Sequence, residues 1–158
     1  TWTLTLLVNE ENSFKVSAAE YLAQTLSASG VTIEVKALPW AEYTAALTAG
    51  NFDLYYGEVK LTADWDLRPL LAIGGSLNYG GWASETTNSL LAAYASATDR
   101  SAAMEALCRH LQQQAPLIPV CFKSTSVLVQ AGVVEGLTPT MTNPFYELPS
   151  CVIHLREG

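Results

Sequence analysis

The side chains best suited to binding chemistry lie in loops that follow an apolar run, Phe52 to Tyr56. The run is typical of a buried strand. Loops at the strand exits of open α/β sheets bind ligands because helix ends and unpaired backbone groups converge there. A carboxylate in such a loop could pair with a cationic group, and aromatic rings beside glycines could stack on a ligand. The candidate ligand-binding residues are Asp64, Trp65, Asn78, Tyr79 and Trp82.

Each candidate also has a structural interpretation, which the sequence leaves open. Asp64 fits a solvated loop carboxylate or a helix cap, both of which are common in Asp-rich turns. Tyr79 and Trp82 could pack against a neighbouring lobe instead of stacking on a ligand. For Asn78 we favour the structural interpretation, in which the side chain fixes the turn to which it belongs.

Catalytic chemistry finds little support in the sequence. A nucleophile needs a base that a third group orients, but His110 lies two positions after Cys108 in a predicted helix, where the two do not share a face. His154 falls in an irregular tail, and no GxSxG, phosphate-binding glycine loop or HExxH motif occurs. Asp64 and Asp66 could be the acid and base of a glycosidase, yet no second carboxylate cluster supports them. We therefore predict no enzyme activity and no catalytic residues, with a hydrolase as the least favoured alternative.

The three cysteines, Cys108, Cys121 and Cys151, indicate neither a metal centre nor a disulfide framework. They have no CxxC spacing and form no cluster of metal ligands with the two histidines. At most one disulfide is possible, and the sequence does not choose the pair. We expect no metal or other cofactor, and we expect Cys108 and Cys121 to be small buried hydrophobic residues.

The composition is that of one folded domain with a sizeable core. Of 158 residues, 49% are hydrophobic and only 15% are charged, which argues against disorder. The net charge of −7 disfavours nucleic acid as a partner, because phosphates call for a basic surface. No run of about 18 apolar residues is present to span a bilayer, and no leader segment is recognisable. Because Thr1-Trp2-Thr3 leads straight into a strand pattern, we expect the chain to be an excised piece.

Strand and helix patterns alternate in the first third of the chain. Short apolar runs bounded by polar residues predict three strands: Leu4–Val8, Val31–Val35 and Phe52–Tyr56. Helices are predicted between them, one capped by Asn12 or Ser13 and ended by Gly30, the other over 40–49. In the first helix, residues spaced four apart predict the buried stripe: Phe14, Ala18, Leu22 and Leu26. This order predicts two βαβ units and a largely parallel sheet with helices on its faces.

The remainder of the chain starts as helices and ends as irregular structure. Helices are predicted over 87–97 and 100–115, the second with Met104, Leu107, Cys108 and Leu111 on one face. Apolar runs predict two more strands, 117–122 and 126–130, although Pro119 suits only an edge or a bulge. From Val133 onward, frequent glycine and proline predict irregular chain.

The order of six short motifs resembles one lobe of the extracytoplasmic solute-binding receptors of ABC importers, in the oligopeptide-, dipeptide- and nickel-binding family. The resemblance covers roughly residues 3 to 140, and the order of the motifs matters more than any one of them. The motifs are a helix over 19–30 before Val31–Val35, then Glu42-Tyr43, Gly50–Leu54, Thr62–Trp65, Asn78–Trp82 and Gln114–Val120.

The resemblance implies an α/β fold like the type II periplasmic binding proteins. This is a three-layer αβα lobe with a mixed, largely parallel sheet. Residues 1–132 correspond to the ligand-binding lobe, the second of two. Residues 133–158 correspond to a return segment towards a first lobe that is missing.

The resemblance also implies binding without chemistry. Two lobes close on a peptide or similar small solute, and a membrane permease recognises the closed form. We therefore expect a monomeric, extracytoplasmic receptor, periplasmic or lipid-anchored as a lipoprotein, with a small-molecule or peptide partner and no nucleic acid. A sensor or regulatory domain that reuses a binding-protein lobe is the alternative.

One site residue follows from the resemblance. In the family's peptide receptors an Asp after a Thr/Ala-like pair neutralises the α-ammonium group of the ligand, and the matching residue here is Asp64. This chain differs from those receptors at Leu61, where many carry Trp, and over Asp64–Pro69, where they usually have an Asp-Pro ending. The class of solute therefore stays open.

Overall fold

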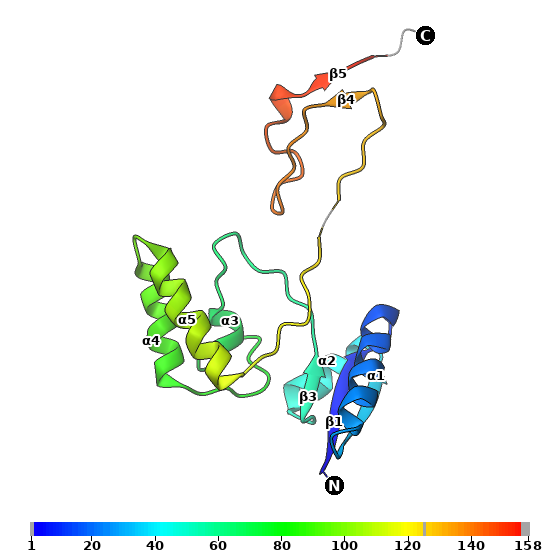
Figure 1. Ribbon diagram of the computed structural model, residues 1–158, viewed down its shortest axis with the longest axis vertical. Coiled ribbons are helices and arrows are strands. Elements are labelled where there is room, and N and C mark those ends of the chain that lie inside the picture. The colour runs from blue at the N-terminus through cyan, green and yellow to red at the C-terminus, as the bar shows by residue number, and fades with distance from the viewer. Residues whose placement is uncertain (1, 125, 156–158) are drawn as a thin grey trace. The chain divides into compact units, whose positions relative to one another are not determined.

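The computed structural model describes residues 2–124 and 126–155. Along the chain they divide into two compact units, with the boundary between Pro116 and Leu117 (Figure 1). The first unit holds a three-stranded sheet with two helices, followed by a cluster of three further helices. Of the predicted lobe and return segment, residues 1, 125 and 156–158 lie outside the described residues.

The sheet of the first unit is built around β1 (Trp2–Asn9), which lies between β2 (Val31–Leu38) and β3 (Leu54–Tyr56). Both neighbours run parallel to β1, with β2 paired along all eight residues and β3 along three. Parallel neighbours need crossover connections, which α1 (Ser13–Ser27) and α2 (Trp40–Ala49) supply. The predicted parallel sheet is confirmed.

The two helices cover opposite faces of the sheet, because consecutive strand side chains point to opposite sides. Leu6 and Val8 of β1 pack with Ala19 of α1 on one face. Leu7, between them, packs with Tyr43 of α2 on the other face. The central strand is therefore apolar at consecutive positions, as is usual where both faces are buried. This arrangement confirms the predicted three-layer αβα lobe.

The buried face of α1 differs from the predicted stripe. Phe14, Leu22 and Leu26 are 66%, 36% and 43% exposed, whereas Ala19 is fully buried and Val16 packs beside it. Residues four apart turn about 400° around a helix, so such a row drifts by about 40° at each step. A long row at this spacing cannot keep facing one sheet, and the prediction was wrong for these three residues.

The helical cluster consists of α3 (Arg68–Leu71), α4 (Glu85–Ser96) and α5 (Arg100–Gln114). Each helix contributes one buried leucine to the centre of the cluster: Leu71, Leu91 and Leu107. Asp99 caps α5 by accepting a hydrogen bond from the Ser101 N–H at 2.9 Å, a common role of Asp at this position. None of the helices in the described residues has the length and apolar character needed to cross a membrane.

Cys108 and Cys121 are exposed, so the prediction that they are buried was wrong. Cys108 lies on a side of α5 that borders an open hollow, and Cys121 belongs to a segment that forms no strand. Neither position is therefore covered by a packed layer. All three cysteines, including Cys151, are free thiols in the structure.

The second unit has little regular structure. A short antiparallel ladder joins β4 (Val134–Glu135) to β5 (Val152–Ile153), and a 3-10 turn, η1 (Leu148–Ser150), precedes β5. The strands predicted over 117–122 and 126–130 do not form, so that prediction was wrong.

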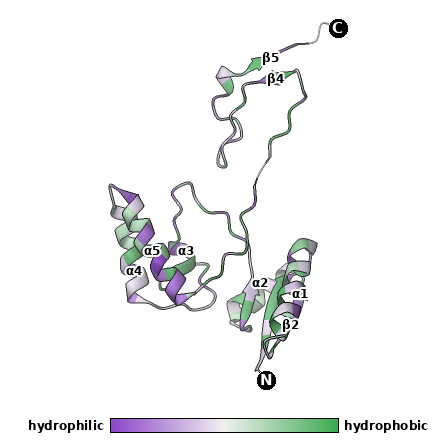
Figure 2. Cartoon of the chain, viewed as in Figure 1, coloured by the Kyte–Doolittle hydropathy of each residue, from purple (hydrophilic) through white to green (hydrophobic). Residues whose placement is uncertain are grey.

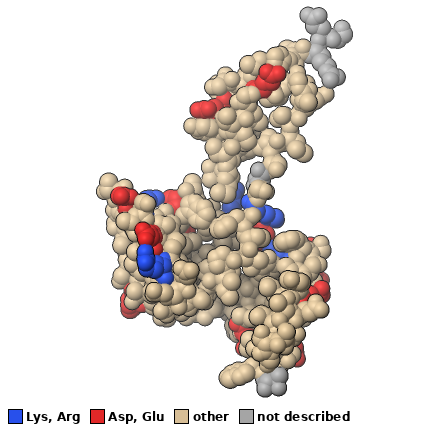
Figure 3. All heavy atoms as spheres, in the orientation of Figure 1, with Lys and Arg blue, Asp and Glu red and all other residues tan. Residues whose placement is uncertain are grey.

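A strand requires a neighbour for its backbone hydrogen bonds, and an apolar run alone does not supply one. Apolar side chains of the segment 117–130 consequently remain on the surface, with Ile118 78% and Leu128 93% exposed. Figure 2 shows hydrophobic stretches along this extended segment. On the face drawn in Figure 3, charged side chains are scattered and form no single basic patch.

Candidate functional site

The loop that follows β3 leads into a hydrogen-bonded turn, residues 62–66, which presents Asp64 and Trp65. The Trp65 N–H donates to the Thr62 carbonyl at 2.9 Å, and the Asp66 N–H donates to the Thr62 hydroxyl at 3.2 Å. From α4, the Tyr94 hydroxyl donates to the Asp64 carbonyl at 2.6 Å. These bonds hold the backbone of the turn in one geometry and attach it to the helical cluster.

The two carboxylates of the turn have different partners. Asp66 accepts two hydrogen bonds from the Arg68 guanidinium, at 2.8 Å from Nε and 2.7 Å from Nη2, which is the strong bidentate geometry. Asp64 is exposed and forms no salt bridge within the described part of the chain. Hydrogen bonding from Thr62, with a smaller effect of the Arg100 charge, lowers the pKa of Asp64 below its ordinary value. Asp64 is thus the ionised carboxylate that can accept an external cation.

Replacing Arg68 with methionine is expected to raise the pKa of Asp66 from about 2 towards its ordinary value of 3.8. Hydrogen bonds from the Arg68 side chain and backbone are the main causes of the lowered pKa. A carboxyl with a lowered pKa stabilises the fold above pH 3.8, and this contribution is lost as the pH falls through about 2. The measurement is the pH titration of the Asp66 carboxyl carbon by NMR.

Arg109→Met is the matched control for this titration, because Arg109 forms an exposed pair with Glu105 on α5 at 2.6 Å. The control should leave the titration of Asp66 where it is in the native chain. An Asp66 midpoint that does not move in Arg68→Met would contradict the assigned cause.

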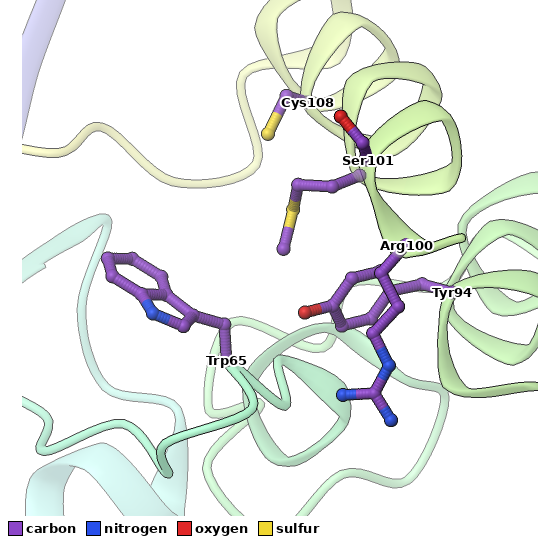
Figure 4. A pocket seen from close by; sticks show the side chains of 6 residues that line it. Trp65, Tyr94, Arg100, Ser101 and Cys108 are labelled. Atoms are coloured by element: carbon purple, nitrogen blue, oxygen red, sulfur yellow. The ribbon is translucent and has the colours of Figure 1, made fainter. Parts of the chain in front are cut away.

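Trp65 lines an open hollow beside the turn (Figure 4). Its φ of 55° is in the left-handed region, which bulky residues rarely adopt, and its side chain remains 39% exposed. In Figure 4 the Tyr94 hydroxyl points towards Trp65, whose indole extends away from Tyr94, and Arg100 lies over the Tyr94 ring, 5.4 Å from its centroid. The hollow has a volume of about 420 Å³ and a largely apolar lining that comes from the turn, α4 and α5: Trp65, Tyr94, Arg100, Ser101, Met104 and Cys108.

Asn78 and Trp82 hold together the loop between α3 and α4. The Asn78 amide donates to the carbonyls of Ala72 (3.0 Å) and Trp82 (2.7 Å) and accepts from the Trp82 N–H (2.8 Å). The Trp82 ring packs against the helical core, and its indole N–H donates to the hydroxyl of the fully buried Thr87 at 3.1 Å. That hydroxyl also lies 3.0 Å from Nε2 of His110. These contacts correspond to the structural interpretation of Asn78, while ligand binding by either side chain stays a prediction.

Tyr79 packs on the side of the sheet covered by α2. Its ring makes an edge contact with Tyr55 of β3, with centroids 6.1 Å apart, and Tyr55 contacts Phe52 in the same way at 5.3 Å. The neighbouring Tyr43 donates its hydroxyl hydrogen bond to the Tyr56 carbonyl at 3.1 Å. Burial, with smaller effects of Tyr55 and Tyr79, raises the pKa of Tyr43 to about 12. Tyr79 therefore connects the loop to the sheet.

Of the candidate residues, the structure places only Trp65 in the lining of the hollow, and Asp64 precedes it in the adjoining turn. Sequence reasoning missed the three residues that face them, Tyr94, Arg100 and Met104. Tyr94 and Met104 occupy apolar positions of the helices predicted over 87–97 and 100–115, a pattern typical of core residues. The available signal is weak: the hydroxyl of a tyrosine on an apolar helix face needs a partner, and here that partner lies 30 residues away.

No protein-family model matches the sequence, and no curated protein matches it significantly. Several solved structures do match. The murein tripeptide-binding protein MppA of Escherichia coli aligns with a TM-score of 0.66 and 24% identity, over 73% of this chain and 24% of its own. The oligopeptide-binding protein AppA of Bacillus subtilis, in complex with a nonapeptide, aligns with a TM-score of 0.66 and 18% identity, over 73% and 24%.

NikA of Staphylococcus aureus, in complex with Ni(L-His)2, aligns with a TM-score of 0.64 and 12% identity, over 73% of this chain and 26% of its own. The chain thus spans about a quarter of the length of these solved structures. The chain has the type II periplasmic-binding-protein fold, as the sequence predicted, and it corresponds to the aligned quarter of these structures.

Proposed function

We propose that this chain is the ligand-binding lobe of a solute-binding receptor of the oligopeptide-, dipeptide- and nickel-binding family, the substrate-binding component of an ABC importer. The shared fold and the order of the six motifs support this proposal. The observation that carries it is the hydrogen-bonded turn that presents Asp64, an exposed carboxylate with no salt bridge in the described residues, beside an open hollow. The solute is a peptide or another small molecule with an ammonium group.

In this proposal the lobe captures the solute and performs no reaction on it. The Asp64 carboxylate pairs with the ammonium group at about 3 Å, as a charge-assisted hydrogen bond requires. Closure of a second lobe excludes water from the pair and so strengthens it. Trp65 lines the cleft, and Tyr79, Asn78 and Trp82 complete its border. The receptor is monomeric and extracytoplasmic and delivers the solute to a membrane permease.

The test is thermal unfolding of the longer receptor, expressed from its full reading frame, with peptides, metal chelates and sugars each in excess. Binding to the folded state raises the stability by about 2.7 kcal/mol at a ligand concentration of 100 times Kd. We expect an amine-bearing solute to raise the Tm and to be recovered unchanged. The proposal fails if no class of solute raises the Tm, or if the stabilising compound is converted to a product.

The isolated 158-residue chain is expected to bind the same solute with a Kd of about 1 mM or weaker. Without the second lobe, the ion pair at Asp64 stays in water, where such pairs contribute only about 0.2–1 kcal/mol. Calorimetry on the chain measures this affinity. Micromolar binding would show that the site is complete in one lobe and would contradict capture by closure.

A further inference from the structure

The backbone of Trp65 is held in an unfavourable conformation by the turn around it. A tryptophan at a φ of 55° costs free energy, and such residues persist only where the surrounding structure over-determines them, often at ligand sites. Here the Thr62 carbonyl fixes the Trp65 N–H at 2.9 Å, and the Tyr94 hydroxyl fixes the preceding carbonyl at 2.6 Å. The strained backbone directs the indole to the edge of the hollow (Figure 4).

The hollow has the size and lining of a site for an apolar group. Its volume of about 420 Å³ falls within the usual range of small-molecule sites, about 300–1,000 Å³. Met104 contributes a flexible, polarizable side chain that adapts to different shapes, and Trp65 and Tyr94 contribute aromatic rings. The one charged lining residue is Arg100, which lies over the Tyr94 ring at 5.4 Å. Its positive charge disfavours a cationic occupant.

The hollow and the turn that carries Asp64 are connected through Tyr94 and Trp65. Tyr94 lines the hollow with its ring while its hydroxyl holds the carbonyl of Asp64. Trp65 lines the hollow and directly follows Asp64 in the chain. The charge of Arg100, which lines the hollow, also acts on the Asp64 carboxylate. An amine paired with Asp64 therefore leaves the substituent on its adjacent carbon within reach of the hollow.

We infer that the hollow is a subsite for an aromatic or aliphatic side chain carried next to the amine of the solute. This inference rests on the proposed function, because Asp64 must bind that amine. It narrows the solute to peptides or related amines with an apolar first side chain, and it disfavours a first side chain that is cationic.

The experiment is an NMR titration of the isotope-labelled full chain with three dipeptides, Phe-Ala, Ala-Ala and Lys-Ala. The chain has only two methionines, Met104 and Met141. The Met104 methyl reports on the hollow, while Met141 lies in the second unit, is 68% exposed and serves as an internal control. The indole N–H of Trp65 provides a second reporter on the hollow.

We expect Phe-Ala to shift the Met104 methyl and the Trp65 indole while Met141 stays in place. Burial of the phenyl ring should make its apparent Kd about tenfold lower than that of Ala-Ala, and Lys-Ala should bind no better than Ala-Ala. Met104→Gln should reduce the preference for Phe-Ala over Ala-Ala, whereas Met141→Gln should preserve it. The reporters in the native chain need no variant, so a Met104 variant that fails to fold does not weaken the test.

Two results would overturn the inference. If Phe-Ala and Ala-Ala bind equally and shift residues 62–66 without moving the Met104 methyl, the hollow is not a subsite, although the proposed function stands. If Lys-Ala binds as tightly as Phe-Ala and shifts Met104 equally, the hollow does not select apolar side chains.

Discussion

Replacing Leu107 with alanine is expected to lower the free energy of unfolding of the helical cluster by about 2–5 kcal/mol. Leu107 is fully buried and meets Leu71 and Leu91 at the centre of the cluster. Removal of its side chain leaves a cavity that the other helices can fill only in part. Urea denaturation followed by the NMR signal of the Met104 methyl group, which packs against this core, reports the change for the cluster itself.

Leu128→Ala is the matched control, because Leu128 is 93% exposed and the chemical change is the same. This control should change the free energy of unfolding by no more than about 0.5 kcal/mol. Equal effects of the two substitutions would show that the three leucines do not form the core of the cluster.

Replacing Asp64 with asparagine is expected to weaken solute binding by the two-lobed receptor by about 30-fold or more. The substitution keeps the size of the side chain and removes its charge. Loss of one partner from a charge pair that becomes desolvated on closure costs about 2–5 kcal/mol, and each 1.4 kcal/mol is about tenfold in Kd. The measurement is calorimetry with the solute that the thermal screen identifies.

Asp66→Asn is the control for Asp64, since both are carboxylates of one turn. The Asp66 carboxylate is already bound by Arg68 at 2.7 and 2.8 Å, so its loss should change Kd by no more than about fivefold, the upper limit for exposed ion pairs. If Asp66→Asn weakens binding as much as Asp64→Asn does, the two carboxylates are not distinguished by their partners.

Elements with local signals could be predicted from the sequence. The central strand contains the apolar run Leu6–Val8. Asn12 and Asp99 cap the helices that follow them, and capping depends on only a few neighbouring residues. The apolar run 117–122 has an equally strong local signal but forms no strand. Strand formation depends on a partner that is often distant in sequence, and no local pattern reports whether that partner is present.

The same distinction between local signals and distant partners applies to the candidate site. Asp64 could be proposed as a candidate because it lies within a short motif, and Asp66 pairs with a residue only two positions away. The hollow could not be predicted, because it brings Trp65 next to residues of two helices, Tyr94 and Met104 among them. Those residues have ordinary helical core patterns, and only the packing of the turn on the helices gives them another role.

The most direct test of the account compares Ala-Ala with N-acetyl-Ala-Ala on the isotope-labelled chain by NMR. Acetylation removes the positive charge of the amine and leaves the rest of the dipeptide intact. The account predicts that the free dipeptide shifts the amide signals of residues 62–66 at millimolar concentration, that the acetylated form does not, and that neither is hydrolysed. Equal shifts from both forms, no shift from either, or cleavage of the peptide would contradict the claim that this lobe binds solutes through Asp64 without reacting with them.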